Sequence, residues 1–411
     1  MRGFQDRTEV TDVVELLRSR LVPLPAETVD LHDAARRVLA DDVRSEIPVP
    51  SFNRAAMDGY ALRGSETFGA TSYSPLELEV IGVVLPGKPF AGSLVAGQAV
   101  RIMTGAPLPQ GADAVLQAEA AEEINGRVRI TEAVPPGRHV GERGEDIEAE
   151  SVVLRAGRVL RPQDLGVLAS IGVGRVGVIR RPRVALIITG DELLPCGSRP
   201  EPYRIVDSNS VMLAALVERD GGIAEPARLI ADRHDSVKGA IVDADADVVL
   251  VSGGSSVGQE DHAPRVVAEV GELCVHGVAL RPASPTGLGF IKDRPVFLLP
   301  GNPVSCLCAY DLFAGVAVRR LGGRNLALPY RVQNMPLARK IASAVGRVDY
   351  VRVIVRERRI EPLAVSGASI LSTTTRADGF VLVPRDSEGF AAGDNVQVYH
   401  YDEQIPGEAG A

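Results

Sequence analysis

The feature that most constrains the fold is a series of apolar segments with no polar alternation. Residues 184–189 read VALIIT, residues 247–252 read DVVLVS and residues 296–299 read VFLL, with helical patterns between them. Strands that are apolar on both faces and separated by helices are typical of a parallel sheet covered by helices on both sides. We therefore predict an α/β domain with a parallel sheet over residues 181–327.

The spacing of apolar residues predicts further strands and helices within and before this domain. Two more strands are predicted at residues 227–231 and 273–278. The predicted helices span residues 10–20, 31–43, 162–171, 208–219, 235–244 and 262–270, and a long one begins at Pro303.

Two other segments have a different texture. Between residues 47 and 147, short apolar runs are broken by Pro-Gly, Gly-Lys-Pro and Gln-Gly turns, which indicates a β-rich module. Residues 328–411 alternate with a period of two, as in RVDYVRVIVRER, which predicts a small antiparallel barrel or sandwich.

Composition excludes several classes of function. The net charge is −8, so binding to nucleic acid through bulk charge is not expected. No stretch is apolar for the 18 or so residues that span a bilayer, and the charged start MRGFQDRTEV does not resemble a signal peptide. We expect a cytoplasmic protein without membrane or nucleic-acid partners, and we expect its four cysteines to be buried as small hydrophobic residues.

Three predicted strands of the α/β domain end in unusual loops, at residues 189–192, 252–258 and 299–305. Ligands bind at the carboxyl ends of parallel strands. Glycines there let backbone N–H groups approach an anion, and Asn302 before Pro303 is an N-cap signature at a helix start, which favours phosphate. One such loop alone would be read as a plain turn, but three in one domain indicate a phosphate-binding site.

Carboxylates accompany these loops. Glu192, Asp232 and Asp261 each follow a predicted strand, and Mg²⁺ beside phosphates needs one or two carboxylates. The alternative is that each caps the next helix, which by itself is the better interpretation of Asp232. Spacing also leaves Glu260 open in place of Asp261.

Six motifs together resemble the MoeA family, the bacterial molybdopterin molybdenumtransferases related to the E domain of gephyrin. In chain order they are AMDGYALR (56–63), RIMTGAP (101–107), RGEDI (143–147), TGDEL (189–193), SGGSSVGQED (252–261) and LPGNPVS (299–305). The resemblance covers residues 6–400 or so. TGDEL with SGGSSVG alone would be weaker, because related pterin-binding domains share that core.

The resemblance implies a multidomain α/β protein of four parts. Residues 1–45 and 150–180 would form an elongated linker domain, into which the β-rich module at 46–149 is inserted. Residues 181–327 would be a MogA-like molybdopterin-binding domain and residues 328–411 a C-terminal β-barrel. The family is typically homodimeric, with each active-site cleft formed between subunits.

The family reaction inserts molybdenum from molybdate into molybdopterin, with Mg²⁺-dependent hydrolysis of adenylated molybdopterin. Position by position, the resemblance implies functional roles for Asp58, Thr104, Asp146, Glu192, Asp232 and Asp261, with the last three at Mg²⁺. The implied substrate-binding residues are Gly190, Ser252, Gly253, Gly254, Ser255, Ser256, Gly258, Arg281, Ser284, Pro300, Gly301, Asn302, Pro303 and Ser305.

One departure from the family concerns the anion site. Many members read Lys-Pro-Gly-Lys-Pro where this chain has Arg281-Pro282-Ala283-Ser284-Pro285. Arg281 keeps one cation, but Ser284 replaces the second, which should weaken anion binding.

The alternatives to the enzyme are a non-catalytic scaffold of the same fold and a hydrolase of another adenylated compound. A molybdopterin adenylyltransferase is a candidate partner.

Overall fold

A computed structural model describes residues 7–254, 262–364 and 367–402. The chain divides into two compact units. Unit 1 comprises Met1–Glu27, Arg36–Val38 and Val178–Ala411, and unit 2 comprises Thr28–Ala35 and Leu39–Gly177. Unit 1 therefore contains both the α/β segment and the C-terminal segment.

A seven-stranded sheet forms the centre of unit 1, with strand order β16-β13-β18-β22-β21-β19 and with β17 also pairing with β13. The strands are β13 (Arg183–Thr189), β16 (Ile223–Ala224), β17 (Arg228–Ile230), β18 (Val248–Ser252), β19 (Glu272–His276), β21 (Gly287–Ile291) and β22 (Arg294–Leu299). The predicted parallel sheet is its core, because β16, β17, β13, β18 and β22 pair in parallel. Only β21, for which no strand was predicted, runs antiparallel to both of its neighbours.

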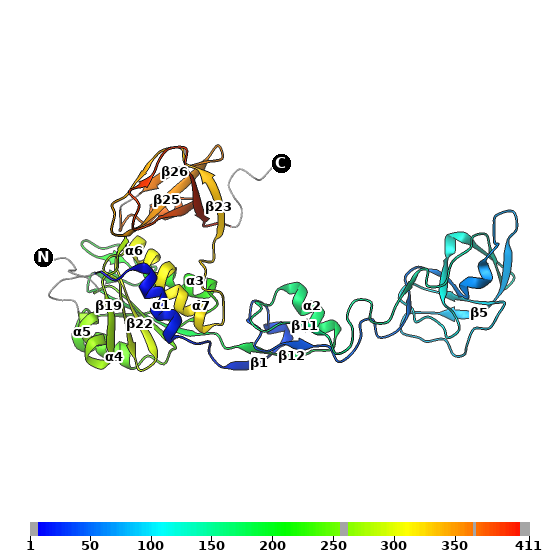
Figure 1. Cartoon of the computed structure of the whole chain (residues 1–411). Coiled ribbons are helices and arrows are strands. Elements are labelled where there is room, and N and C mark those ends of the chain that lie inside the picture. The colour runs from blue at the N-terminus through cyan, green and yellow to red at the C-terminus, as the bar shows by residue number, and fades with distance from the viewer. Residues whose placement is uncertain (1–6, 255–261, 365–366, 403–411) are drawn as a thin grey trace. The chain divides into compact units, whose positions relative to one another are not determined.

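Helices cover both faces of this sheet, as the strand pattern predicts. Leu186, Ile188 and Leu250 belong to one hydrophobic core, while Ile187 and Val249 belong to a second. The first core includes residues of α1 (Val10–Arg20), α3 (Asn209–Arg219), α6 (Pro303–Ala309) and α7 (Gly315–Leu321). The second includes residues of α4 (His234–Val242) and α5 (His262–Val270), all labelled in Figure 1.

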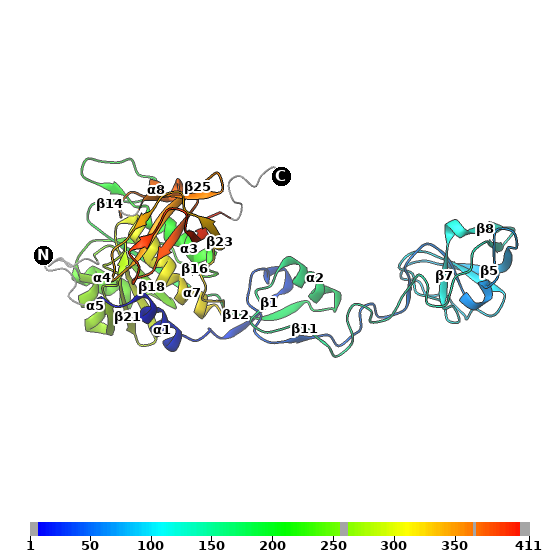
Figure 2. The same ribbon diagram turned by 45° about the horizontal axis from the view of Figure 1, so that its top comes forward.

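The C-terminal segment forms five strands of a six-stranded sheet that closes on itself, and the sixth strand, β20, comes from the α/β segment. Its order is β20-β25-β27-β29-β23, and β26 also pairs with β25. A bridge between Leu337 and Ile360 joins the segment after β23 to β26. The strands are β20 (Leu280–Arg281), β23 (Arg331–Pro336), β25 (Val348–Arg356), β26 (Arg359–Ala364), β27 (Gly379–Val383) and β29 (Asn395–His400). The barrel packs against the helices of unit 1 (Figure 2), because Tyr350 and Phe380 belong to the first hydrophobic core.

A buried ionic network lies at this junction. Asp311 is in a π-helical turn, Tyr310–Ala314, that joins α6 to α7. Its fully buried carboxylate lies 3.0 Å from Nη2 of Arg219 and accepts hydrogen bonds from Tyr330 and Tyr350. Burial raises the pKa of Asp311, and the carboxylates of Asp311 and Asp220 raise the pKa of Arg219 against its own desolvation. The network thus joins α3, the turn between α6 and α7, and the barrel.

Unit 2 contains a second six-stranded sheet, of order β7-β4-β6-β5-β9-β8. Its strands are β4 (Gly59–Leu62), β5 (Leu76–Val84), β6 (Gln98–Ile102), β7 (Ala114–Gln117), β8 (Ala121–Ile124) and β9 (Arg127–Ile130). Smaller pairs join β1 (Ala26–Asp30) to β12 (Arg175–Ile179), β2 (Val43–Arg44) to β11 (Val152–Leu154) and β3 (Arg54–Ala55) to β10 (Val140–Gly141). The β-rich texture of residues 47–147 therefore corresponds to a folded sheet.

The helix predicted at residues 31–43 is wrong. Only a single 3₁₀ turn forms there, at Leu31–Asp33. The backbone beyond it pairs over long range, since the N–H of Leu39 donates to the Arg158 carbonyl and that of Ala40 to the Gly177 carbonyl. These long-range hydrogen bonds override the local helical pattern.

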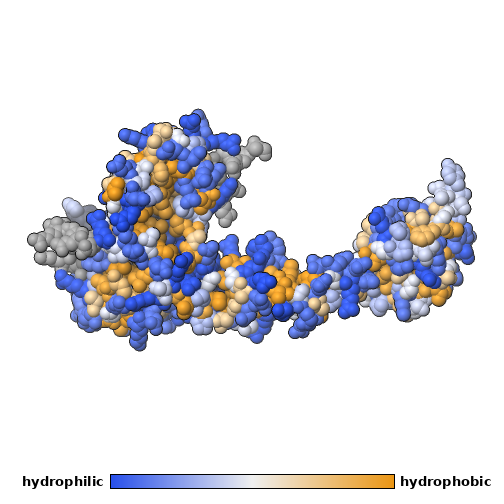
Figure 3. Space-filling model, in the orientation of Figure 1, coloured by the Kyte–Doolittle hydropathy of each residue, from blue (hydrophilic) through white to orange (hydrophobic). Residues whose placement is uncertain are grey.

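The expectation of four buried cysteines holds only for Cys306 and Cys308, which are buried in α6. Cys196 is exposed and Cys274 is half-buried. Hydrophobic and hydrophilic residues are interspersed on the surfaces seen in Figure 3. Within the described ranges, no helix is both long and apolar enough to cross a membrane.

Replacing Asp311 tests the network at the junction. In Asp311→Ala, Arg219 and two tyrosine hydroxyls lose a buried partner, so we expect a loss of about 3–5 kcal/mol in the free energy of unfolding. Urea denaturation followed by circular dichroism measures it. Asp245→Ala is the matched control, because Asp245 is a largely exposed partner of Arg183 and should change stability by less than about 0.5 kcal/mol. Equal midpoints for the two variants would contradict this role of Asp311.

A second prediction concerns α2 (Pro162–Ser170), which is capped by Asp164. The carboxylate accepts hydrogen bonds from the Arg158 guanidinium at 2.9 Å and from the Arg161 guanidinium and backbone N–H, and these lower the pKa of Asp164 well below its usual range. Because the folded pKa is the lower one, the ionised group stabilises the fold above the unfolded pKa of about 3.9. That contribution is lost as pH falls through the folded pKa.

We therefore expect Asp164→Asn to be less stable than the wild type by about 1.5 kcal/mol at pH 7, with the difference shrinking below about pH 4. Thermal midpoints of both proteins between pH 7 and pH 2 measure this. A difference that stays constant over the whole range would show that the charge of Asp164 has no part in it.

Candidate functional site

The three predicted strand-end loops meet at one edge of the unit 1 sheet. Strands β13, β18 and β22 are adjacent and parallel, and Ser252 lies opposite both Ile188 and Leu299 in the registers. Their carboxyl ends therefore lie side by side. The loops after Thr189, Ser252 and Leu299 consequently border a common space.

That space is a cavity of about 490 Å³. Ten of the predicted residues line it: Gly190, Glu192, Asp232, Ser252, Gly253, Gly254, Pro300, Gly301, Asn302 and Pro303. The remaining lining includes Asp207, Ser208, Asn209, Pro285 and Ser369. Among the described lining residues there is no lysine or arginine, whereas Glu192, Asp207 and Asp232 are acidic.

The glycine at position 253 is required by the backbone. Its φ is +100°, and a Cβ atom there would lie 2.2 Å from the carbonyl oxygen of Thr189. A side chain would therefore force the ends of β13 and β18 apart. Gly254 follows with φ +55°, and a Cβ there would lie 3.1 Å from Oδ1 of Asp232. The two glycines thus keep the loop backbone close to the carboxylate.

Two of the three predicted Mg²⁺ ligands face this cavity. Asp232 accepts a hydrogen bond of 3.1 Å from the Thr189 hydroxyl, and Glu192 is exposed on the cavity wall. No group of three His, Cys, Asp or Glu side chains that could hold a metal occurs within the described ranges. Two carboxylates in a cavity whose described lining has no basic group fit Mg²⁺, which keeps several waters and takes one or two carboxylates beside phosphate oxygens.

Ser255, Ser256, Gly258 and Asp261, together with the alternative Glu260, lie outside the described residues. The roles predicted for them stay predictions.

Three other predicted residues do not line the cavity. Ser305 is buried inside α6. Ser284 donates a 3.4 Å hydrogen bond to the Val278 carbonyl. Arg281 forms an ion pair with the fully buried Asp349 of the barrel, which also accepts a hydrogen bond from Ser343 at 2.6 Å. The one cation expected to bind an anion is therefore already paired.

The remaining predicted residues belong to unit 2, and two of them are in contact. Oδ1 of Asp58 accepts hydrogen bonds of 2.6 Å from both the backbone N–H and the hydroxyl of Thr104, and these bonds lower the pKa of Asp58. Both side chains are exposed. Asp146 is also exposed, and its backbone N–H donates to the Val49 carbonyl.

Sequence reasoning missed Asp207 and Asn209. Asp207 follows the short strand β15 (Ile205–Val206), and its Oδ1 accepts the backbone N–H groups of Asn209 and Ser210 at the start of α3. Asn209 donates through Nδ2 to the Ser252 hydroxyl at 2.9 Å and to the Gly301 carbonyl at 2.8 Å. An acid and an amide just before a predicted helix look like ordinary capping residues, so the only signal was their place beside the loops.

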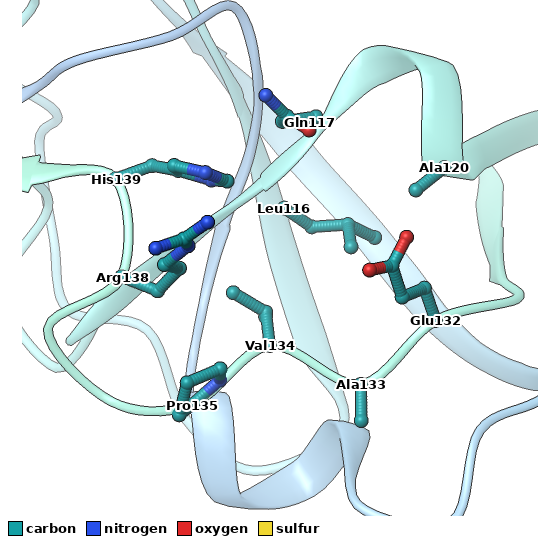
Figure 4. Close-up of a pocket in the computed structure, with 9 residues that line it drawn as sticks. All are labelled: Leu116, Gln117, Ala120, Glu132, Ala133, Val134, Pro135, Arg138 and His139. Carbon is teal, nitrogen blue, oxygen red and sulfur yellow. The ribbon is translucent and has the colours of Figure 1, made fainter.

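A second cavity, of about 320 Å³, lies in unit 2 beside β7 (Figure 4). Leu116 and Val134 form its apolar part, and the side chains of Glu132, Arg138 and His139 are polar groups around it. It contains none of the predicted residues, whereas the unit 1 cavity contains ten. The unit 1 cavity is therefore the better candidate site.

Three family models together match nearly the whole chain. The family model for the MoeA N-terminal region (domain I and II) matches residues 8–172, the model described as "Probable molybdopterin binding domain" matches residues 185–320, and that for the MoeA C-terminal region (domain IV) matches residues 334–401.

Relatives match over the full length. The molybdopterin molybdenumtransferase 2 of Mycobacterium tuberculosis is 35% identical over 415 residues, covering 97% of this chain and 99% of the relative. The molybdopterin molybdenumtransferase of Haemophilus influenzae is 32% identical, with coverages of 93% and 96%. A crystal structure of the molybdopterin biosynthesis MoeA protein of Pyrococcus horikoshii has a TM-score of 0.84 at 34% identity and covers 97% of this chain and 100% of its own.

The contact between Asp58 and Thr104 leads to a prediction about the pKa of Asp58. Thr104→Val removes the hydroxyl but keeps the backbone N–H, so the pKa of Asp58 should rise toward the ordinary value of about 3.9. Titration of the Asp58 carboxyl carbon by NMR measures this. Thr104→Ser keeps the hydroxyl and should leave the pKa lowered. An unchanged pKa in Thr104→Val would mean that the hydroxyl does not stabilise the carboxylate.

Proposed function

The chain belongs to the MoeA family, and we propose that it is a molybdopterin molybdenumtransferase of molybdenum-cofactor biosynthesis. The observation that carries the proposal is the unit 1 cavity, where glycine-rich loops and two family-matched carboxylates, Glu192 and Asp232, lie together. The full-length identity to two relatives named for this activity supports it.

We propose adenylated molybdopterin and molybdate as the substrates. The backbone N–H groups of Gly190 and Gly253 already donate to the carbonyls of Ile230 and Leu299. Backbone N–H groups of the loops at Gly254 and Gly301 would bind substrate phosphate oxygens, since glycines allow the backbone to approach an anion. The Ser252 hydroxyl accepts a hydrogen bond from Asn209, and its own O–H would be a further donor for these oxygens. The loops therefore position the phosphate end of the substrate.

We also propose Mg²⁺ as a cofactor, held by Glu192, Asp232 and Asp261. When bound, it would neutralise the charge of the phosphoric anhydride that is hydrolysed. The Thr189 hydroxyl orients Asp232 in the cavity wall, and Gly254 leaves the space beside that carboxylate open.

The residues of unit 2 that the family resemblance singles out would contribute to a site through dimer formation. We propose a homodimer in which Asp58, Thr104 and Asp146 complete a site of the second subunit. The hydrogen bonds from Thr104 keep Asp58 ionised, as a group that stabilises a cation must be. We further propose the cytoplasm as its location and a molybdopterin adenylyltransferase as the partner that supplies the substrate.

The experiment is an assay of Mg²⁺-dependent AMP release from adenylated molybdopterin, with and without molybdate. We expect AMP release coupled to molybdenum insertion. For Glu192→Gln we expect both rates to fall roughly a hundredfold or more, because a metal ligand is lost. Glu201→Gln is the control, since Glu201 is exposed and pairs only with Arg204 among the described residues, and its rates should equal the wild type.

Each contrary outcome identifies an alternative. Absence of AMP release by the wild type would indicate a scaffold protein, and AMP release without molybdenum insertion would indicate a hydrolase of adenylated compounds. A Glu192→Gln protein with normal rates would contradict the role of that carboxylate while leaving the function intact.

A further inference from the structure

The wall of the unit 1 cavity formed by the start of α3 contains two buried hydrogen-bond acceptors that lack a donor. Asp207 is 4% exposed and Asn209 is 7% exposed, and both line the cavity. Neither Oδ2 of Asp207 nor Oδ1 of Asn209 has a hydrogen-bond partner in the described structure. Most buried acceptors in folded proteins are hydrogen-bonded, so two exceptions from residues two positions apart at the start of α3 require an explanation.

Neither side chain can turn to find a partner elsewhere. The other carboxylate oxygen of Asp207 already accepts two backbone N–H groups, from Asn209 at 2.9 Å and from Ser210 at 3.2 Å. The amide nitrogen of Asn209 is fixed by Ser252 and Gly301. Rotating either group would break two hydrogen bonds, so the free oxygens are held in place by the fold.

The chemistry of the wall selects the kind of ligand. A carboxylate oxygen and an amide oxygen repel anions and accept N–H donors. The described lining carries three acids and no base, so an anionic group is not expected at this end of the cavity. The glycine loops, whose backbone a ligand can approach closely, are suited to the anionic end of a ligand instead.

A metal ion would be the alternative occupant of the two oxygens. The described residues hold no group of three His, Cys, Asp or Glu side chains suited to a metal. Asp207 also offers only one of its two carboxylate oxygens, because the other caps α3. Two unpaired acceptors in the same stretch of cavity wall instead match a flat heterocycle that presents an exocyclic amino group next to a ring N–H.

We infer that Asp207 and Asn209 bind the amino and N–H edge of a 2-amino-4-oxo heterocycle. The inference rests on the proposed function, because the pterin ring of molybdopterin has this edge. It adds which wall of the cavity binds the ring and which residues set the specificity for the amino group. The phosphate end of the substrate then lies toward the glycine loops.

The test compares two probes on the full-length protein: pterin, with a 2-amino group, and lumazine, with a 2-oxo group in its place. Titration of probe fluorescence gives both dissociation constants. We expect the wild type to bind pterin roughly ten- to a hundredfold more tightly than lumazine, because a 2-oxo group faces the carboxylate oxygen without a donor.

The variant is Asp207→Asn, which preserves shape. Its remaining Oδ1 still accepts the N–H groups of Asn209 and Ser210, so its Nδ2 takes the place of the free oxygen. We expect pterin affinity to fall roughly ten- to a hundredfold and lumazine affinity to stay or rise, which removes or reverses the preference. A circular dichroism melting curve like that of the wild type verifies that α3 stays capped.

Asp235→Asn is the matched control, since Asp235 is an exposed residue of α4 in the same unit, and the wild-type preference should persist. Equal loss of both probes in Asp207→Asn, or an unchanged preference, would overturn the inference. Retention of that preference only when a divalent cation is added would assign the oxygens to a metal and also overturn it.

The outcome is separable from that of the proposed function. If the Asp207→Asn protein loses the pterin preference but the wild type does not insert molybdenum, the proposed reaction fails and the binding wall stands. If the wild type inserts molybdenum but Asp207→Asn discriminates the probes as before, only the assignment of this wall fails.

Discussion

The buried contact between Asp311 and Arg219 fixes the two helices on which the candidate site is built. Arg219 is the last residue of α3, and Asp311 lies in the π-helical turn that follows α6. The other ends of these helices, at Asn209 and Pro303, line the cavity, and Asn209 bonds directly to Gly301 before α6. The helices are thus joined at both ends, so the cavity wall is held by contacts remote from it.

Five of the chain's aromatic residues gather around the same network. The chain has eight tyrosines, nine phenylalanines and no tryptophan. Tyr330, Tyr350, Phe380, Tyr399 and Tyr401 contact one another at the junction, and the hydroxyls of Tyr330 and Tyr350 reach Asp311. Aromatic side chains bury large areas and offer a polar end, so they can cover a buried carboxylate and join a barrel to a helical layer.

The sequence predicted what depends on local pattern and missed what depends on long-range pairing. Apolar runs such as Val184–Thr189 lie in a buried strand, and the three loops do meet, because parallel strands place their carboxyl ends together. The segment 31–43 failed because its backbone bonds to residues more than a hundred positions away. Asp207 and Asn209 were missed for a similar reason. The hydrogen bonds of Asp207 to the start of α3 are those of an ordinary helix cap. Only the long-range hydrogen bonds of Asn209 to Ser252 and Gly301 show that both residues lie in the cavity wall.

The pairing of Arg281 restricts which groups of the cavity can bind an anion. Its guanidinium is paired with Asp349, which has no exposed surface, and Arg347 also contacts that carboxylate at 3.2 Å. Releasing Arg281 would leave a buried carboxylate with one cation fewer, which is strongly unfavourable. The described lining of the cavity has no base of its own, so phosphate oxygens bound there would depend on backbone N–H groups, on hydroxyls and on a cation that the carboxylates attract. An acidic cavity therefore suits a ligand whose anionic end arrives with a divalent cation and whose other end supplies N–H donors.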